Sequence, residues 1–266
     1  MSENEIVLQG GNVTAVVRIG ETVRRQLKPM SSTIHRLLLH LEEMKFDGAP
    51  RFLGIDEKQR EILSFVSGET DSGQYPFLKP YMRSDEALTE MAWLLRKYHD
   101  ATASFPREEK DEWMMAYPGK QHAEVICHND AAPYNVVFRN GSPAALIDFD
   151  TACPGPRIWD IAYALYTFVP LTGSVPTFEG KFVPYDRTVH ADQRRRRIQL
   201  FFEGYGIPQP DNFLEQVEDR LGALCDTLVT RAANGDEAFA RMVEEGHLEH
   251  YRREIEFVRS FGKEWI

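Results

Sequence analysis

The residues that could carry chemistry gather in one stretch of the chain. His128, Asp130 and Asn135 lie in a loop-like segment that contains Pro133, and Asp148 follows a short strand-like run. Carboxylate and amide oxygens are hard ligands, and Mg²⁺ is the ion that suits them best in proteins. Each of these residues alone is more typical of a turn. Together, the two carboxylates, the amide and the imidazole predict a site whose oxygen ligands suit a hard ion, Mg²⁺ above all.

The elements that must position these side chains form a predicted β-hairpin. Residues 136–147 have the pattern of a strand, a turn and a second strand, with the turn signal around Gly141-Ser142. If the turn centres there, Asn135 and Asp148 face each other across the open end of the hairpin, with Cα atoms roughly 5 Å apart. Asp130 then arrives beside them from the preceding loop.

We assign His128 to structure rather than to the metal. An imidazole can bind a metal, but a hard ion prefers oxygen ligands. We expect its ring to hydrogen-bond the backbone of the loop that holds Asp130. Cys127 directly precedes it, and we expect a small buried residue there, because adjacency in sequence is not the arrangement that a thiol nucleophile needs.

The first part of the chain is rich in β-prone runs around one helix, and the remainder is mostly helical. The expected strands are Ile6–Leu8, Ala15–Ile19, Thr22–Gln26, Arg51–Ile55 and Glu61–Val66. One helix is expected after a cap at Ser31 or Ser32, because apolar residues recur at helical spacing from Ile34 to Leu41. The later expected helices are Asp85–Ala103, Gln193–Tyr205, Asn212–Ala232 and Asp236–Phe261. This order predicts an α+β fold with a small N-terminal lobe, residues 1–66, and a larger helical lobe, residues 67–266.

Composition narrows the class of protein. The chain has 266 residues, 42% of them apolar, which excludes disordered and collagen-like classes. Its net charge of −10 disfavours nucleic-acid partners. We expect no secretory signal and no membrane partner, since the most apolar stretch, Ile158 to Leu171, is too short to span a bilayer. The three widely spaced cysteines suit reduced thiols, so we expect a cytoplasmic protein.

The acidic residues are unevenly spread. From Phe201 to Ile266 there are fourteen Asp or Glu residues and seven Arg or Lys residues. Solvated helix faces are the ordinary interpretation, and a lobe that favours a cationic ligand is the alternative. The alternative requires carboxylates from residues 211–256 to face Asp130. In contrast, the run Arg194 to Arg197 is expected to form an exposed basic face of a helix.

The spacing of these residues resembles a known family. His128-x-Asp130, Asn135 and Ile147-Asp148-x-Asp150, together with Asp160 downstream, are similar to the H-x-D-x4-N and I-D-x-D pattern of the aminoglycoside phosphotransferase family. The resemblance covers essentially the whole chain. Residues 126–164 also resemble a bacterial subgroup of trifolitoxin-immunity-like phosphotransferases. The resemblance to the aminoglycoside phosphotransferase family implies a protein-kinase-like fold whose N-terminal lobe binds a nucleotide.

The resemblance implies a role for each matching residue. Asp130 takes the position of the catalytic aspartate, which orients an acceptor hydroxyl and accepts its proton. Asn135 and Asp148 take the positions of the Mg²⁺ ligands. Asp160 takes that of a helix aspartate that braces the catalytic loop through backbone amides. Asp150 replaces a glycine, and we expect it to hydrogen-bond locally rather than to bind a second metal.

The nucleotide site is implied with two departures from the pattern. Ser64-Phe65-Val66 resembles the hinge, where backbone groups of Ser64 and Val66 would hydrogen-bond adenine. Gly10-Gly11 is not a full glycine-rich loop. The strand lysine is absent and its position best matches Arg25, which could either clamp phosphate oxygens or lie on a solvent-exposed edge. Ile34 and His35 stand where its glutamate partner is expected, so we do not expect the lysine–glutamate pair of kinases.

The implied cofactors are ATP or GTP, with Mg²⁺. The acceptor is expected to be a small molecule, because only eleven residues separate Asp148 from Asp160, too few for a segment that docks a polypeptide. An aminoglycoside-like amine, as in antibiotic resistance or immunity, is the first candidate acceptor. A metabolic kinase for choline, homoserine or a sugar is the alternative, as is a non-catalytic immunity or binding protein. The sequence leaves the oligomeric state open.

Overall fold

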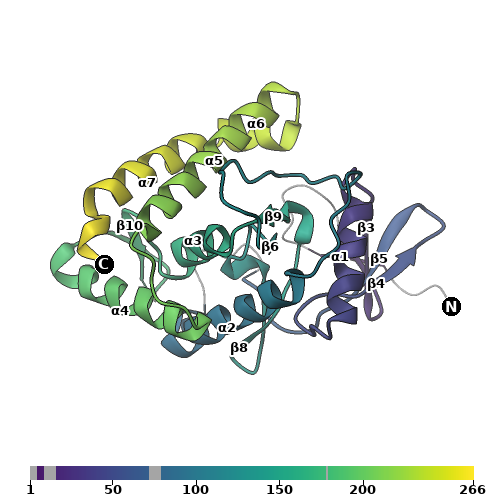
Figure 1. Ribbon diagram of the computed structural model, residues 1–266, viewed down its shortest axis with the longest axis horizontal. Helices are drawn as coiled ribbons and strands as arrows, with labels where there is room; N and C mark the ends of the chain where they lie inside the picture. The colour runs from purple at the N-terminus through teal and green to yellow at the C-terminus, as the bar shows by residue number, and fades with distance from the viewer. Residues whose placement is uncertain (1–4, 9–15, 72–78, 178) are drawn as a thin grey trace.

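The computed structural model describes residues 5–8, 16–71, 79–177 and 179–266. An antiparallel sheet with one helix against it occupies the N-terminal end, and the helices of the larger part lie beyond it (Figure 1). The sheet has five strands in the order β1-β2-β3-β5-β4. These strands are β1 (Ile6–Leu8), β2 (Val16–Ile19), β3 (Thr22–Gln26), β4 (Phe52–Ile55) and β5 (Arg60–Ser64). The predicted α+β fold is confirmed.

The helix of the N-terminal part is α1 (Ser31–Glu43), which forms because its apolar residues recur at helical spacing. Ile34, Leu37 and Leu41 are buried in the core. The helix contacts β4 and also α2, so it links the sheet to the helical part. Ser31 is the first helical residue and does not cap the helix, because its hydroxyl instead accepts a hydrogen bond from the backbone N–H of Lys28 (2.9 Å).

Over the described residues, the larger part contains the remaining α-helices and three short antiparallel strand pairs. The helices are α2 (Asp85–Thr102), α3 (Arg157–Phe168), α4 (Arg187–Tyr205), α5 (Phe213–Ala233), α6 (Glu237–Glu244) and α7 (His247–Phe261). The strand pairs are β6 (Val125–Cys127) with β9 (Cys153–Gly155), β7 (Val136–Arg139) with β8 (Ser142–Leu146), and β10 (Ser174–Pro176) with β11 (Phe182–Pro184). In the described ranges, no helix is both long and apolar enough to cross a membrane.

Two expectations about the helices are wrong. The single helix expected over Asp236–Phe261 is divided into α6 and α7, because Gly246 has φ +86° and ends the regular backbone. The basic run on α4 is not a uniformly exposed face, since Arg194 and Arg197 are buried. Arg197 donates to the Asp85 carboxylate (2.6 Å), and Arg194 to the carbonyl of Thr172 (2.7 Å). A pattern of charges alone did not reveal these partners.

Two helix glycines test the packing of the larger part. Gly204 lies where α4 meets α2, and a Cβ there would fall 2.8 Å from the backbone oxygen of Thr89, whereas a Cβ at Gly222 in α5 would meet nothing within 4 Å. We expect Gly204→Ala to lower the free energy of unfolding by about 1–3 kcal/mol through overpacking. Gly222→Ala should raise it by roughly 0.5–1 kcal/mol through helix propensity. Chemical denaturation measures both, and equal effects of the two variants would contradict the packing argument.

Candidate functional site

A cavity of about 390 Å³ lies between the N-terminal sheet and the β7–β8 hairpin. Its walls are mainly apolar and include Val23, Ile34, Leu63, Val137 and Phe149. The predicted nucleotide and metal residues also line it, namely Arg25, Ser64, Val66, Asn135 and Asp148. The structure thus brings side chains from β3, the end of β5 and the hairpin to one place. Gly10-Gly11 lies outside the described residues.

The predicted register of the hairpin is wrong by one residue. The turn centres on Asn140-Gly141, which have φ of +52° and +87°, rather than on Gly141-Ser142. A bulge between Val137 and Phe138 then shifts the pairing back by part of that difference. As a result Asn135 lies opposite Ile147, and the Ile147 N–H donates to the carbonyl of Asn135 (2.9 Å). Asp148 follows one position further along, still at the edge of the cavity.

Asp130 lies behind two residues that line the cavity. Its Oδ2 accepts a hydrogen bond from Asn135 Nδ2 (2.8 Å), and its Oδ1 accepts one from the Tyr134 hydroxyl (2.6 Å). Tyr134 Oη is 3.1 Å from the hydroxyl of Tyr163 on α3. Burial raises the pKa of Asp130 above its usual value, although the Tyr134 hydrogen bond lowers it in part. Asp130 and the predicted metal ligand Asn135 are therefore directly connected.

The loop before Asp130 is held by the Asp160 carboxylate. Asp160 lies in the first turn of α3, with none of its side chain exposed. Its oxygens accept hydrogen bonds from the backbone N–H groups of His128 (2.7 Å) and Asn129 (2.8 Å), and from His99 Nε2 (3.0 Å). Burial alone would raise the pKa of Asp160, but these donors hold it below its usual value. The buried charge fixes the path of the loop.

The side chains of two further residues, His128 and Arg220, hold the same loop from other sides. His128 Nε2 lies 3.0 Å from the carbonyl of Ile147, next to Asp148, and its Nδ1 accepts from the N–H of Asp130 (3.3 Å). Arg220 on α5 donates to the carbonyl of Asn129 (2.5 Å) and is almost fully buried. Sequence reasoning gave Arg220 no role, because its position in a helical pattern carries no sign of this contact.

The backbone is strained next to Asp130 and at Asp148. Asn129 has φ +64° and Asp148 has φ +62°. Non-glycine residues rarely adopt this left-handed conformation, and Asn and Asp tolerate it best. Such residues persist where the surroundings fix them, typically at functional sites.

Arg25 lies among three carboxylates. It pairs with Glu61 on the neighbouring strand β5, with Asp148 (3.1 Å) and with Asp150 (2.7 Å). Its side chain is only 12% exposed, so the solvent-exposed edge considered from the sequence is wrong. Although burial lowers the pKa of Arg25, the three carboxylates raise it overall. Lys28 also pairs with Asp150 (2.6 Å), which is consistent with a local role for that carboxylate.

A cation–glutamate pair is present after all, although it is built differently from that of kinases. The glutamate comes from β5, where the strand register places Glu61 directly opposite Arg25. His35 on α1 stands where the glutamate was sought, and its Nε2 lies 2.6 Å from Glu61 Oε2. A search confined to the following helix could not find this partner. The order β3-β5 in the sheet supplies it.

At the predicted hinge, Ser64 and Val66 both line the cavity. The Ser64 N–H donates to the carbonyl of Arg51 (2.9 Å), and the Phe65 N–H donates to that of Glu21 (2.8 Å). Of the two predicted adenine contacts, Ser64 can therefore offer only its carbonyl without breaking a sheet bond.

Several acidic residues of the C-terminal region have structural partners. Glu218 and Glu256 pair with Arg259, Asp236 caps α6, and Glu254 accepts the backbone N–H of Gly173 (2.7 Å). None of the described residues that line the cavity comes from residues 211–256, and the cation of Arg220 lowers the pKa of Asp130. The acidic balance of the last helices therefore lends no support to a cationic acceptor.

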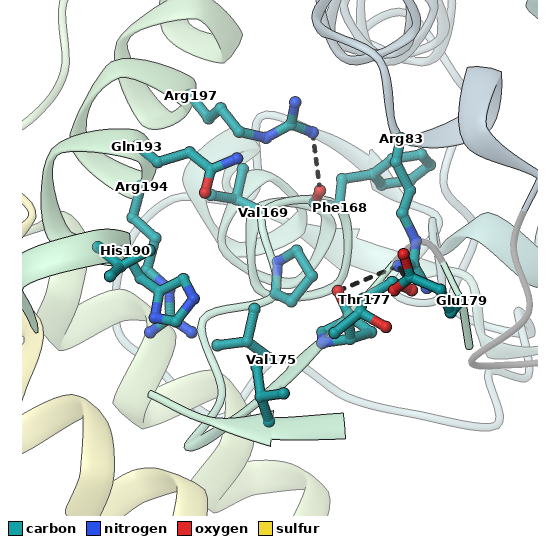
Figure 2. Close-up of a pocket in the computed structure, with 14 residues that line it drawn as sticks. Arg83, Phe168, Val169, Val175, Thr177, Glu179, His190, Gln193, Arg194 and Arg197 are labelled. Carbon is teal, nitrogen blue, oxygen red and sulfur yellow. Dashed lines mark hydrogen bonds between the residues drawn. The ribbon is translucent and has the colours of Figure 1, made fainter. Parts of the chain in front are cut away.

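A second cavity, of about 280 Å³, lies at the end of α3 beside α4 and the β10–β11 pair (Figure 2). Its polar lining is rich in arginine, but those side chains are engaged within the protein. Arg197 donates to the carbonyl of Phe168 (3.2 Å) and Arg83 to that of Thr177 (3.0 Å). Among the described residues that line it, none belongs to the predicted site. The first cavity is therefore the candidate site.

Comparison with solved structures defines the class of fold. Amicoumacin kinase hAmiN, solved with AMP-PNP, Ca²⁺ and Ami, superimposes with a TM-score of 0.65 at 12% identity, over 95% of this chain and 87% of that one. A choline/ethanolamine kinase family protein from Mesorhizobium loti gives a TM-score of 0.54 at 13% identity, over 97% and 92% of the two chains. The predicted protein-kinase-like fold, with its β-rich N-terminal lobe and mostly helical C-terminal lobe, is confirmed.

Sequence comparison then gives the family. Residues 68–198 match the phosphotransferase enzyme family, APH. The trifolitoxin immunity protein of Rhizobium leguminosarum bv. trifolii is 34% identical over 236 residues, which is 87% of this chain and 82% of that protein. The chain belongs to the APH phosphotransferase family, as its motif spacing indicated.

The Arg25–Glu61 pair can be tested by a double-mutant cycle. Arg25→Met leaves Glu61, only 1% exposed, without its cation, so we expect a loss of about 3–5 kcal/mol in the free energy of unfolding. Arg25→Met combined with Glu61→Met should recover much of that loss. Arg259→Met is the control, because Arg259 is exposed and forms surface ion pairs with Glu218 and Glu256. Its loss should change the free energy of unfolding by less than about 1 kcal/mol. Additive losses in urea unfolding would contradict the coupling.

The Asp160 brace can be tested by Asp160→Asn. The amide group replaces one acceptor oxygen with a donor that faces another donor, so we expect about 2–4 kcal/mol of destabilisation. Asp192→Asn is the matched control, since Asp192 is 92% exposed and should be silent. Thermal unfolding measures both, and an unchanged melting temperature for Asp160→Asn would show that the carboxylate does not hold the loop.

Proposed function

We propose that this protein transfers the γ-phosphate of ATP or GTP, with Mg²⁺, to a hydroxyl of a small molecule. The observation that carries the proposal is the hydrogen-bonded pair of Asp130 and Asn135 at the edge of a cavity that also contains Asp148 and Arg25. In the proposed reaction these residues would supply a proton acceptor, two oxygen ligands and a cation around one space. Membership of a phosphotransferase family supports the same chemistry.

The donor set fits Mg²⁺. Asp148 has a side chain that is 54% exposed at the cavity, and Asn135 adds an amide oxygen. Among the described residues, no group of three or more His, Cys, Asp or Glu side chains could hold a metal. That suits Mg²⁺, which is usually held by one or two protein ligands, substrate phosphates and water. When bound there, the ion would neutralise phosphate charge during transfer.

The cavity suits a nucleotide. Its volume falls within the roughly 300–1,000 Å³ of small-molecule sites. The apolar walls would bury the base, and the Ser64 carbonyl and Val66 would meet its polar edge. Arg25 would turn from Asp148 towards the phosphates, which its fork of donors can bind bidentately. The N-terminal lobe over residues 1–66 would then hold the nucleotide, and the lobe over residues 67–266 the acceptor.

Asp130 would orient the acceptor hydroxyl and accept its proton. Because phosphoryl transfer asks for little covalent chemistry from the protein, positioning and charge stabilisation account for most of the rate. The fixed loop described above is what such positioning requires. A non-catalytic immunity protein was suggested by the absent strand lysine, and the buried Arg25–Glu61 pair weakens that alternative.

Two classes of acceptor are candidates, and a panel of acceptors distinguishes them. The trifolitoxin immunity protein and the amicoumacin kinase favour an antibiotic-like acceptor, in resistance or immunity. The choline/ethanolamine kinase family protein keeps a metabolic alcohol such as choline, homoserine or a sugar as the alternative. We expect the protein to act in the cytoplasm.

The proposal predicts that Asp130→Asn abolishes most transfer and retains the nucleotide. We expect turnover with Mg²⁺ and ATP or GTP, across a panel of aminoglycosides, choline, homoserine and sugars, to fall by about 10²–10⁴-fold. Calorimetric binding of the nucleotide should persist, and Asp192→Asn should match the wild type. If the wild-type protein binds neither nucleotide in the presence of Mg²⁺, the proposed function is wrong.

A further inference from the structure

The hydroxyl of a tyrosine already donates a hydrogen bond to the carboxylate of Asp130. Tyr134 immediately precedes Asn135 in a short 3₁₀ turn, Pro133–Asn135, and its Oη donates to Asp130 Oδ1 at 2.6 Å. This is the length of a strong hydrogen bond between a hydroxyl and a carboxylate. The bond joins an alcohol to the carboxylate that the proposed reaction needs for the alcohol of its acceptor.

The Tyr134 hydroxyl is held in place from behind. Tyr163 on α3, only 5% exposed, lies with its hydroxyl 3.1 Å from that of Tyr134. The Tyr134 side chain itself is 39% exposed and lines the cavity. The phenol therefore stands between the cavity and Asp130, with one face open to a ligand and its hydroxyl fixed by two partners.

Both oxygens of Asp130 have donors in this arrangement. Oδ1 accepts from Tyr134 and Oδ2 accepts from Asn135 (2.8 Å). A carboxylate oxygen can accept a second hydrogen bond, but Tyr134 lines the cavity and Asp130 does not. A water molecule or an acceptor hydroxyl that reaches Oδ1 from the cavity must therefore displace the phenol. A small polar molecule that gains only one hydrogen bond in exchange gains little net free energy, because one hydrogen bond replaces another. An acceptor that gains further contacts in the cavity can drive the exchange.

We propose that Tyr134 is a surrogate acceptor, whose hydroxyl holds Asp130 while no acceptor is bound and prevents water from being activated there. The proposal rests on the proposed phosphotransferase function and deepens it, since it makes Tyr134 the residue that selects an acceptor against water. Tyr134 is a positioning residue in this scheme and forms no covalent bond. Its displacement couples acceptor binding to release of the proton-accepting oxygen.

The test is hydrolysis of ATP or GTP, with Mg²⁺ and without any acceptor. Tyr134→Phe keeps the ring and removes the hydroxyl, which leaves room for a water at Oδ1. We expect hydrolysis to rise by about tenfold, the scale of one hydrogen bond to a charged group. The double variant Tyr134→Phe with Asp130→Asn should lose this gain, because the gain must act through Asp130. A purely structural role for the phenol would not give that dependence.

The matched control is Tyr185→Phe. Tyr185 also donates its hydroxyl to a carboxylate, Glu264 Oε2 (2.9 Å), but it packs with Trp265 and Phe257 in the C-terminal helices. Its loss should leave hydrolysis unchanged. Tyr163→Phe should raise hydrolysis by less than Tyr134→Phe, because the bond between Tyr134 and Asp130 remains.

The outcomes separate the surrogate role from the proposed function. Nucleotide binding by wild type with no rise in hydrolysis for Tyr134→Phe would overturn the surrogate role and leave the phosphotransferase proposal standing. Absence of nucleotide binding by calorimetry would overturn both. Intact mass after incubation with Mg²⁺ and nucleotide is the last readout. A phosphate found on Tyr134 would overturn the proposal as well, since the phenol would then be a true acceptor.

Discussion

The buried carboxylate of Asp160 is the constraint on which the rest of the site depends. A charge with no exposed surface is costly unless several donors satisfy it. The donors are two successive backbone N–H groups of the loop, at His128 and Asn129, and the ring of His99. Satisfying the charge therefore forces both peptide groups to point towards α3, and the positive φ of Asn129 is consistent with that demand. Asp130 is the next residue, so its position follows directly.

The remaining contacts extend this constraint to the end of the hairpin that carries Asp148. The His128 ring bridges the loop to the Ile147 carbonyl, immediately before Asp148. Arg220 reaches the carbonyl of Asn129 from α5. Catalytic groups keep their geometry when the residues around them lock their rotamers and backbone. Loop, hairpin and helical lobe are thus tied together by hydrogen bonds rather than by the apolar core alone.

Sequence reasoning found what depends on local spacing. The α+β order, most element bounds and the clustering of Asn135 with Asp148 follow from short-range patterns. The hairpin register was wrong because either Asn140-Gly141 or Gly141-Ser142 can form a turn, and the bulge leaves no mark in composition. Glu61 was missed because its pairing with Arg25 depends on which strands are neighbours in the sheet. The burial of Arg194 and Arg197 was missed because helical charges show their partners only once helices pack.

One property of the site unites its two halves. The half that would meet the acceptor has Asp130 held by Tyr134 and Asn135, and the half that would meet the metal has Asp148 held by Arg25. A half-buried cavity with unpaired charges would destabilise the fold, so the protein satisfies these groups with its own side chains. Ligand binding at such a site is an exchange of partners, and its free energy is the difference between two satisfied states. Only a ligand that replaces the lost contacts and adds its own can open the site, so in the proposed reaction the internal bonds would themselves select the ligands that bind.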